Sequence, residues 1–127
     1  MFTATKPEDM NPTFARAFNS RDIENLMALY EQRAQLRADE TGRTHTGHAA
    51  IRAELTALLQ APGTMTSRNN FCLVFEDIAL LRADWMLEHG GQTIASGSSA
   101  EIVRRQDDGR WLYIVDHAMG ASLPAIT

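Results

Sequence analysis

Two acidic residues near the end of the chain, Glu101 and Asp116, have a spacing that could bring their carboxyl groups together. They lie on the two arms of a predicted hairpin, because Asp108-Gly109 between alternating apolar runs is typical of a tight turn. If Asp108-Gly109 is a two-residue loop, Glu101 pairs directly opposite Asp116, and a four-residue loop closed by the same pair of residues keeps this register. Two carboxyl groups enclosed side by side keep one proton between them near neutral pH, which suits general acid/base catalysis.

A second register for this hairpin stays open. Asp107-Asp108-Gly109 could form a three-residue loop with a bulge at Gly109, which would shift the pairing by one residue. Glu101 and Asp116 would then point to opposite faces of the sheet. Roles without catalysis also stay open: Glu101 could pair with an arginine at the rim, and Asp116 could hydrogen-bond to backbone at the end of the sheet.

Other chemistry finds little support in the sequence. His45 and His48 flank a turn and a helix start, without the cluster of cysteines or acids that a metal site needs. The serines at 96–99 do not form the Gly-x-Ser-x-Gly turn of a nucleophilic serine, and no glycine-rich phosphate loop occurs. We therefore expect neither a metal nor an organic cofactor.

Three helices are predicted in the first half of the chain. Asn11-Pro12 is a suitable helix start, with asparagine as the cap and proline at the first position. A second helix is predicted from an apolar stripe at i, i+3, i+4 and i+7, which consists of Ile23, Leu26, Met27 and Tyr30. The third is predicted over 47–60 and ends at Ala61-Pro62-Gly63.

Five strands complete the predicted order, ααβαββββ. A short strand at 34–39 and a turn at 40–43 precede the third helix, and long alternating runs follow it at 66–76, 79–89, 92–106 and 111–119. Helices grouped before a meander of strands indicate an α+β fold with a mostly antiparallel sheet.

The last strand is apolar on both faces. Trp111, Tyr113 and Val115 lie on one side of it, and Leu112 and Ile114 lie on the other. A single layer of helices covers only one face of a sheet, so the second face needs another cover. A symmetric partner subunit is the simplest one, and we expect a homodimer through the sheet.

Composition restricts the class of protein further. The chain has 127 residues, 44% of them hydrophobic, which suits one globular domain over 1–127. A formal net charge of −4 argues against a nucleic-acid partner. No apolar window is long enough to span a membrane, and the start does not resemble a secretory signal. The lone cysteine, Cys72, fits a reducing compartment, so we expect a cytoplasmic protein.

Three short motifs follow one another along the chain. Residues 18–22 (Phe-Asn-Ser-Arg-Asp) lead into the apolar run 26–30, residues 46–52 read Thr-Gly-His-Ala-Ala-Ile-Arg, and residues 108–111 read Asp-Gly-Arg-Trp. In this order they resemble the nuclear transport factor 2-like superfamily over about residues 8–119. That superfamily includes the ketosteroid isomerases and the SnoaL-like polyketide cyclases.

The resemblance implies a cone-shaped, cystatin-like fold in which three helices pack on a strongly curved, mixed but mostly antiparallel sheet. It also implies an apolar pocket with carboxylates inside. The isomerase tyrosine falls on Phe14 and the isomerase base on Ala38, so two of its three functional groups are missing. The third acid falls on Glu101, and the acid of the SnoaL-like cyclases matches Asp116.

Two functions are therefore carried forward from the sequence. The first is a domain that binds an apolar small molecule without a specific activity. The second is a cofactor-independent isomerase, cyclase or dehydratase that acts on an apolar carbonyl compound by carboxylate proton transfer, with Asp116 and Glu101 as catalytic residues. In both cases we expect the pocket to be lined by Phe14, Tyr30, Ala38, Trp85, Leu112 and Ile114.

Overall fold

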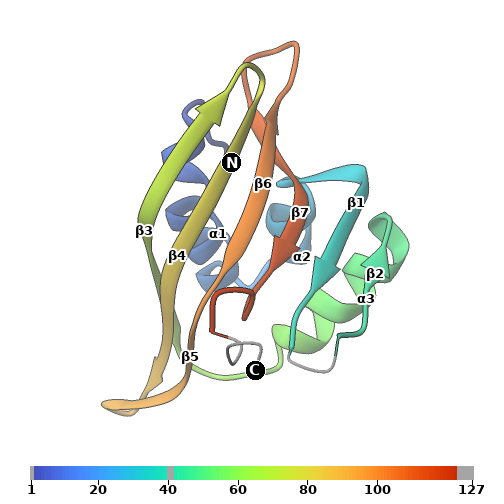
Figure 1. Cartoon of the computed structure of the whole chain (residues 1–127). Helices are drawn as coiled ribbons and strands as arrows, with labels where there is room; N and C mark the ends of the chain where they lie inside the picture. Colours follow the sequence, from blue (N-terminus) through green and yellow to red (C-terminus); the bar gives the residue numbers. More distant parts are fainter. Residues whose placement is uncertain (1, 40–41, 123–127) are drawn as a thin grey trace.

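The computed structural model describes residues 2–39 and 42–122 and shows helices packed on one curved sheet (Figure 1). The helices are a short 3-10 helix, η1 (Pro7–Asp9), and three α-helices, α1 (Met10–Asn19), α2 (Ile23–Met27) and α3 (His48–Leu58). Helix α1 packs against β3 (Thr64–Phe75), and α3 packs against β1 (Tyr30–Arg37). None of the helices in these two segments is long and apolar enough to cross a membrane.

The sheet has the strand order β2-β1-β7-β6-β4-β3, and β5 pairs with β4 beside this path. The remaining strands are β2 (His45–Thr46), β4 (Ile78–His89), β5 (Gln92–Ser98), β6 (Ala100–Arg105) and β7 (Trp111–His117). Strands β1 and β7 run parallel, and the other pairs are antiparallel. The predicted α+β class with a mixed, mostly antiparallel sheet is confirmed.

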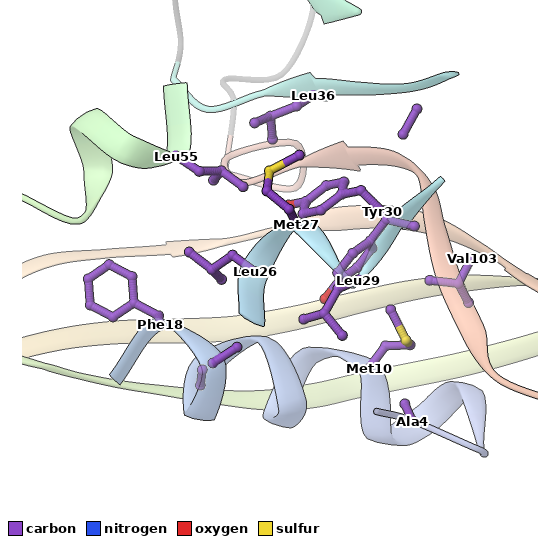
Figure 2. Packing of buried hydrophobic residues seen from close by; sticks show 14 of the residues in the cluster. Ala4, Met10, Phe18, Leu26, Met27, Leu29, Tyr30, Leu36, Leu55 and Val103 are labelled. Atoms are coloured by element: carbon purple, nitrogen blue, oxygen red, sulfur yellow. The ribbon is translucent and has the colours of Figure 1, made fainter. Parts of the chain in front are cut away.

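The core lies between the helices and the concave face of the sheet. Its largest fully buried side chains include Phe18, Leu26 and Leu55 from the helices and Val103 from β6. Figure 2 shows Leu55 and Met27 lying toward Tyr30, where α2 and α3 meet the first strand. Burial of these apolar groups is the main source of stability, at roughly 25 cal/mol per Å² removed from water.

The second helix is shorter than its apolar stripe predicts. It ends at Met27, and Tyr30 instead opens β1. The carbonyl of Leu29 accepts a hydrogen bond from the backbone of Tyr113 at 2.8 Å, so pairing with β7 begins where a further helical turn would have been. Leu26, Met27 and Tyr30 are still buried, because the chain turns into the sheet with the same side facing inward.

The predicted strand 92–106 is two strands, interrupted at Ser99. The backbone of Ser99 donates to the carbonyl of Ala83 at 2.8 Å, and its hydroxyl accepts from the backbone of Ala83 at 3.1 Å. A side chain thus takes the place of a backbone acceptor, and the ladder breaks there. Strand β5 pairs with one end of β4, and β6 pairs with the other end (Figure 1). Strand β6 also pairs with β7.

One smaller element also differs from the prediction, and another is not tested. The short strand β2 was not anticipated and pairs with β1 through Gln35 and Leu36. The predicted turn at 40–43 falls partly outside the described residues.

The motif at 18–22 has a structural explanation. The Asn19 amide donates to the carbonyl of Met65 at 2.9 Å and accepts from its backbone N–H at 2.8 Å, which fixes the end of α1 to the start of β3. Asp22 caps α2 by accepting from the backbone of Glu24 at 2.9 Å. Arg21 donates to the carbonyl of Leu59 at 3.0 Å, just beyond the end of α3. The motif therefore joins the helices to the sheet.

The double hydrogen bond of Asn19 should contribute measurably to stability. We expect Asn19→Ala to lower the free energy of unfolding by about 1–2 kcal/mol, because both backbone groups of Met65 lose their partner. Asn25→Ala is the control, since that amide donates to the exposed Ser20 hydroxyl at 2.9 Å, and its effect should stay below about 0.5 kcal/mol. Urea unfolding of both variants measures this, and equal effects would contradict it.

Candidate functional site

The turn between β6 and β7 is the three-residue loop Asp107-Asp108-Gly109. Gln106 accepts from the backbone of Gly109 at 2.9 Å and donates from its own backbone to Arg110 at 2.7 Å. Gly109 has φ of 90°, a left-handed conformation that glycine adopts without strain. The predicted two-residue loop is wrong, and the alternative loop is present.

Glu101 nevertheless pairs directly opposite Asp116, as the first register predicted. Near the loop, Val103 pairs with Tyr113, but the register then shifts and Ile102 pairs with Val115. Ile114 is the extra residue of this β-bulge. The bulge restores the offset that the longer loop had introduced, so the pairing is correct although the reason for it is different.

The bulge also reverses which side chains point inward. Tyr113 and Asp116 are both buried on the concave side, although plain alternation would place them on opposite faces. The prediction that Leu112 and Ile114 line the pocket is therefore wrong. Leu112 borders an open surface hollow beside Glu31, and Ile114 borders another that also includes Val115.

A cavity of about 190 Å³ lies at the concave side of the sheet and contains the carboxyl pair. Three residues that the sequence assigned to a pocket, Phe14, Ala38 and Trp85, line it together with Glu101 and Asp116. The other lining residues are mostly apolar, namely Leu36, Leu55, Leu58, Ala61, Met65, Leu87, Ala95 and Ala118, with Asn11, Ser67, Ser99 and Tyr113 as further polar or aromatic members.

Asp116 accepts a hydrogen bond from Tyr30. The Tyr30 hydroxyl donates to Oδ2 of Asp116 at 2.5 Å, and both side chains are buried. Tyr30 does not itself line the cavity, so it would act on a ligand only through its hydrogen bond to Asp116. Among the described residues, only Tyr30 donates a side-chain hydrogen bond to this carboxyl group.

Glu101 is held by an amide from the first helix. Nδ2 of Asn11 donates to Oε1 of Glu101 at 3.0 Å and to Oδ1 of Asn69 at 2.9 Å. The Tyr113 hydroxyl donates to Oδ1 of Asn11 at 2.7 Å, which fixes the orientation of the amide. Since Oε1 of Glu101 already accepts a hydrogen bond, a proton on this carboxyl group is best placed on Oε2.

Burial raises the pKa of both acids. It raises the pKa of Glu101 to about 8, together with the charge of Asp116 and against the hydrogen bonds from Ser99 and Asn11. Burial also raises the pKa of Asp116 to about 6, against the hydrogen bond from Tyr30. Between these values the pair holds one proton, with Glu101 as the acid and Asp116 as the base.

The two tyrosines remain hydroxyl donors. Burial first, and then the charge of Asp116, raise the pKa of both Tyr30 and Tyr113 above the ordinary value. No group of three or more histidine, cysteine or acidic residues that could hold a metal occurs in the described part of the chain.

Asn11, Tyr113 and Ser99 were not predicted as site residues. The Asn11-Pro12 pattern indicated Asn11 as the helix cap, but α1 begins at Met10, with Asp9 in the cap position, and the Asn11 amide donates to Glu101 on β6. Tyr113 was assigned to the outer face because the bulge is invisible to an alternation count. An asparagine beside a proline and a tyrosine on an apolar strand carry no local signal for contacts about 100 residues apart.

The fold and the enclosed acid pair define a class of α+β proteins with a cavity at the concave face of a curved sheet. The chain belongs to the SnoaL-like domain family, whose sequence model matches residues 13–114. No curated relative matches the chain.

Solved structures agree on the fold. An NTF-2-like protein of unknown function from Shewanella oneidensis is 21% identical, with a TM-score of 0.69, over 81% of this chain and 87% of that one. A Thiobacillus denitrificans protein, provisionally named a calcium/calmodulin-dependent protein kinase type II association domain, is 21% identical, with a TM-score of 0.77, over 90% and 94%.

A Parabacteroides distasonis protein with the provisional name ketosteroid isomerase is 18% identical, with a TM-score of 0.68, over 91% and 92%. At these identities the likeness establishes the fold and says nothing about activity. The family model confirms the SnoaL-like part of the resemblance, and the solved structures confirm the fold that the resemblance implied.

The raised pKa of Glu101 predicts a pH-dependent stability. Folding favours the protonated acid, so stability is greatest below the ordinary pKa of 4.5 and falls as the pH rises toward about 8. We expect Glu101→Gln to remove most of this loss above pH 6, because the amide keeps the shape and carries no charge. Urea unfolding between pH 5 and 9 measures it, with the exposed Glu88→Gln as the control. Parallel curves for wild type and Glu101→Gln would contradict the assignment.

Proposed function

We propose that this protein binds an apolar carbonyl compound in the cavity and moves a proton on it without a cofactor, as an isomerase, cyclase or dehydratase does. One observation carries the proposal: Glu101 and Asp116 are direct cross-strand partners, both are buried, and both line the same mainly apolar cavity. Enclosure keeps one acid protonated and the other ionised at neutral pH, so the site holds both an acid and a base.

The proposed proton transfer balances within the site. Asp116 removes a proton from the carbon next to the carbonyl group, and the electron pair moves onto the carbonyl oxygen. The protonated Glu101 donates a hydrogen bond to this oxygen and stabilises the enolate that forms. Asp116 then returns the proton to another carbon of the same compound, so no oxidant or reductant is needed.

The arrangement differs from that implied for a ketosteroid isomerase. Phe14 and Ala38 stand where the resemblance puts the isomerase tyrosine and base, and both give the cavity an apolar wall. The base in this proposal comes from the last strand instead, at Asp116. Steroid isomerisation is therefore not part of the proposal.

The activity should depend on the ionised Asp116. We expect Asp116→Asn to slow exchange of the α-protons of cyclohex-2-enone in D₂O at least about 100-fold, the usual size of a lost general base. Proton NMR measures the exchange. Asp84→Asn, which changes an exposed acid of β4, is the control and should leave the rate unchanged. Binding of the enone without exchange in wild type would leave a binding domain and exclude the catalytic proposal.

The rate should follow a bell-shaped pH profile. It should rise through the pKa of Asp116 near 6, where the base ionises, and fall above the pKa of Glu101 near 8, where the acid is lost. Tyr30→Phe should move the rising limb to higher pH, because its hydroxyl bond lowers the pKa of Asp116. A rising limb that does not move would contradict the role of Tyr30.

We also propose that two copies associate through the outer face of the sheet in the cytoplasm. Leu73, Leu80, Ile102 and Val115 are direct neighbours in one row across β3, β4, β6 and β7. Leu73 is 65% exposed and Leu80 is 42% exposed. A continuous apolar row of this kind, as opposed to scattered apolar residues, is typical of an interface. The absence of charge in the row suits a second copy of the same surface.

Light scattering in dilute solution tests the dimer. We expect twice the chain mass of 14.1 kDa for wild type and a shift to monomer for Leu73→Glu, because the interface would bury an unpaired charge. Ile94→Glu is the matched control, since Ile94 is also exposed, at 47%, but lies on β5 outside the row. Wild type that remains monomeric would contradict the proposal.

A further inference from the structure

The size of the cavity limits what the site accepts. Its volume is about 190 Å³. A dry apolar cavity of about 150 Å³ holds a molecule of benzene, whereas sites for drug-sized ligands are typically about 300–1,000 Å³. The space therefore suits a single six-membered ring with a small polar group.

Trp85 is a fixed wall of this space. Its indole Nε1 donates to the carbonyl of Ala118 at 2.7 Å, which holds the ring from the C-terminal side of the cavity. On the neighbouring strand, Gly97 pairs with Trp85, and a Cβ at position 97 would lie 3.0 Å from the ring carbon Cζ2. The same Cβ would lie 2.5 Å from Sδ of Met119. The hydrogen bond to Ala118 and the close backbone of Gly97 thus hold the ring on two sides and favour this position of the wall.

The charge of the cavity restricts the ligand as well. Its charged lining residues in the described part of the chain are Glu101 and Asp116, and no lysine, arginine or histidine lines it there. A carboxylate placed beside them would meet like charge without a cation to pair with. An uncharged carbonyl group has no such penalty and can accept a hydrogen bond from the carboxylic acid.

We infer that the site accepts an uncharged carbonyl compound with a single ring, rejects carboxylates of the same size, and excludes fused-ring compounds because of Trp85. The inference rests on the proposed function for the carbonyl group, while the limits on size and charge come from the cavity itself. Trp85 is thereby a specificity-determining residue.

The charge limit is tested with an isosteric pair in calorimetric titrations at pH 7. 4-Oxocyclohex-2-ene-1-carboxamide and the corresponding carboxylate have the same shape and differ in charge. We expect the carboxylate to bind at least about 100-fold more weakly to wild type. In the double variant Glu101→Gln, Asp116→Asn this ratio should fall below about tenfold. Equal binding of the pair by wild type, or no binding of the carboxamide, would overturn the inference.

The size limit is tested with cyclohex-2-enone and a bicyclic octalone. Wild type should bind the octalone at least about tenfold more weakly, and Trp85→Leu should reverse this preference because it removes the wall. Trp85→Phe keeps most of the ring volume and should relax the limit only in part, which covers the case in which Trp85→Leu does not fold. Circular dichroism checks folding. A wild type that prefers the octalone would overturn the inference.

The two proposals fail in different ways. Selective binding without α-proton exchange keeps the limits on size and charge and excludes the proton transfer. Exchange on the carboxylate or on the octalone at the rate of the single-ring ketone keeps the proton transfer and excludes the selection.

Discussion

The carboxyl groups of Glu101 and Asp116 lie inside the molecule, and no cation contacts them in the part of the chain that the structure describes. Enclosing two acids side by side costs stability, and the surrounding elements reduce this cost by donating hydrogen bonds. Asn11 donates from α1 to one acid, and Tyr30 donates from β1 to the other. The first helix and the first strand are thereby joined to the last hairpin, so the position of the pair and the packing of these elements depend on each other.

The β-bulge at Ile114 makes this arrangement possible. In a regular strand, Tyr113 and Asp116 would face opposite sides, and only one could reach the cavity. With the bulge, Tyr113 orients Asn11 from the inner face while Asp116 also points inward, and Val115 remains on the outer face. One strand therefore serves both the candidate site and the apolar row. A second copy packed on Val115 would contact the same stretch of β7 that carries Asp116.

The sequence predicts the class of fold and most of its elements, because helical and strand periodicities are local properties. It does not predict the features that depend on contacts between residues far apart in the sequence. Tyr30 fits the helical stripe, yet pairing with β7 draws it into the sheet. The pairing of Glu101 with Asp116 is predicted from a loop that is wrong, because the longer loop and the bulge each shift the register by one residue and cancel. Leu112 and Ile114 show the same limit, since the bulge alone decides their face. The amide of Asn11 could not be assigned to the site, since its partners lie on β3, β6 and β7.

The two acids cost more stability than a purely structural role requires. A glutamine and an asparagine would fill the same space, and their oxygens could accept the same hydrogen bonds from Asn11 and Tyr30 without the cost of a buried charge. What the acids add is a proton that can be gained and lost near neutral pH. Groups that lower stability and have strongly shifted pKa values are concentrated at functional sites, where the shift is useful to the chemistry. The apolar wall of Phe14, Ala38 and Trp85 has the same effect, because apolar side chains cannot solvate a charged carboxylate and so help to keep both pKa values raised.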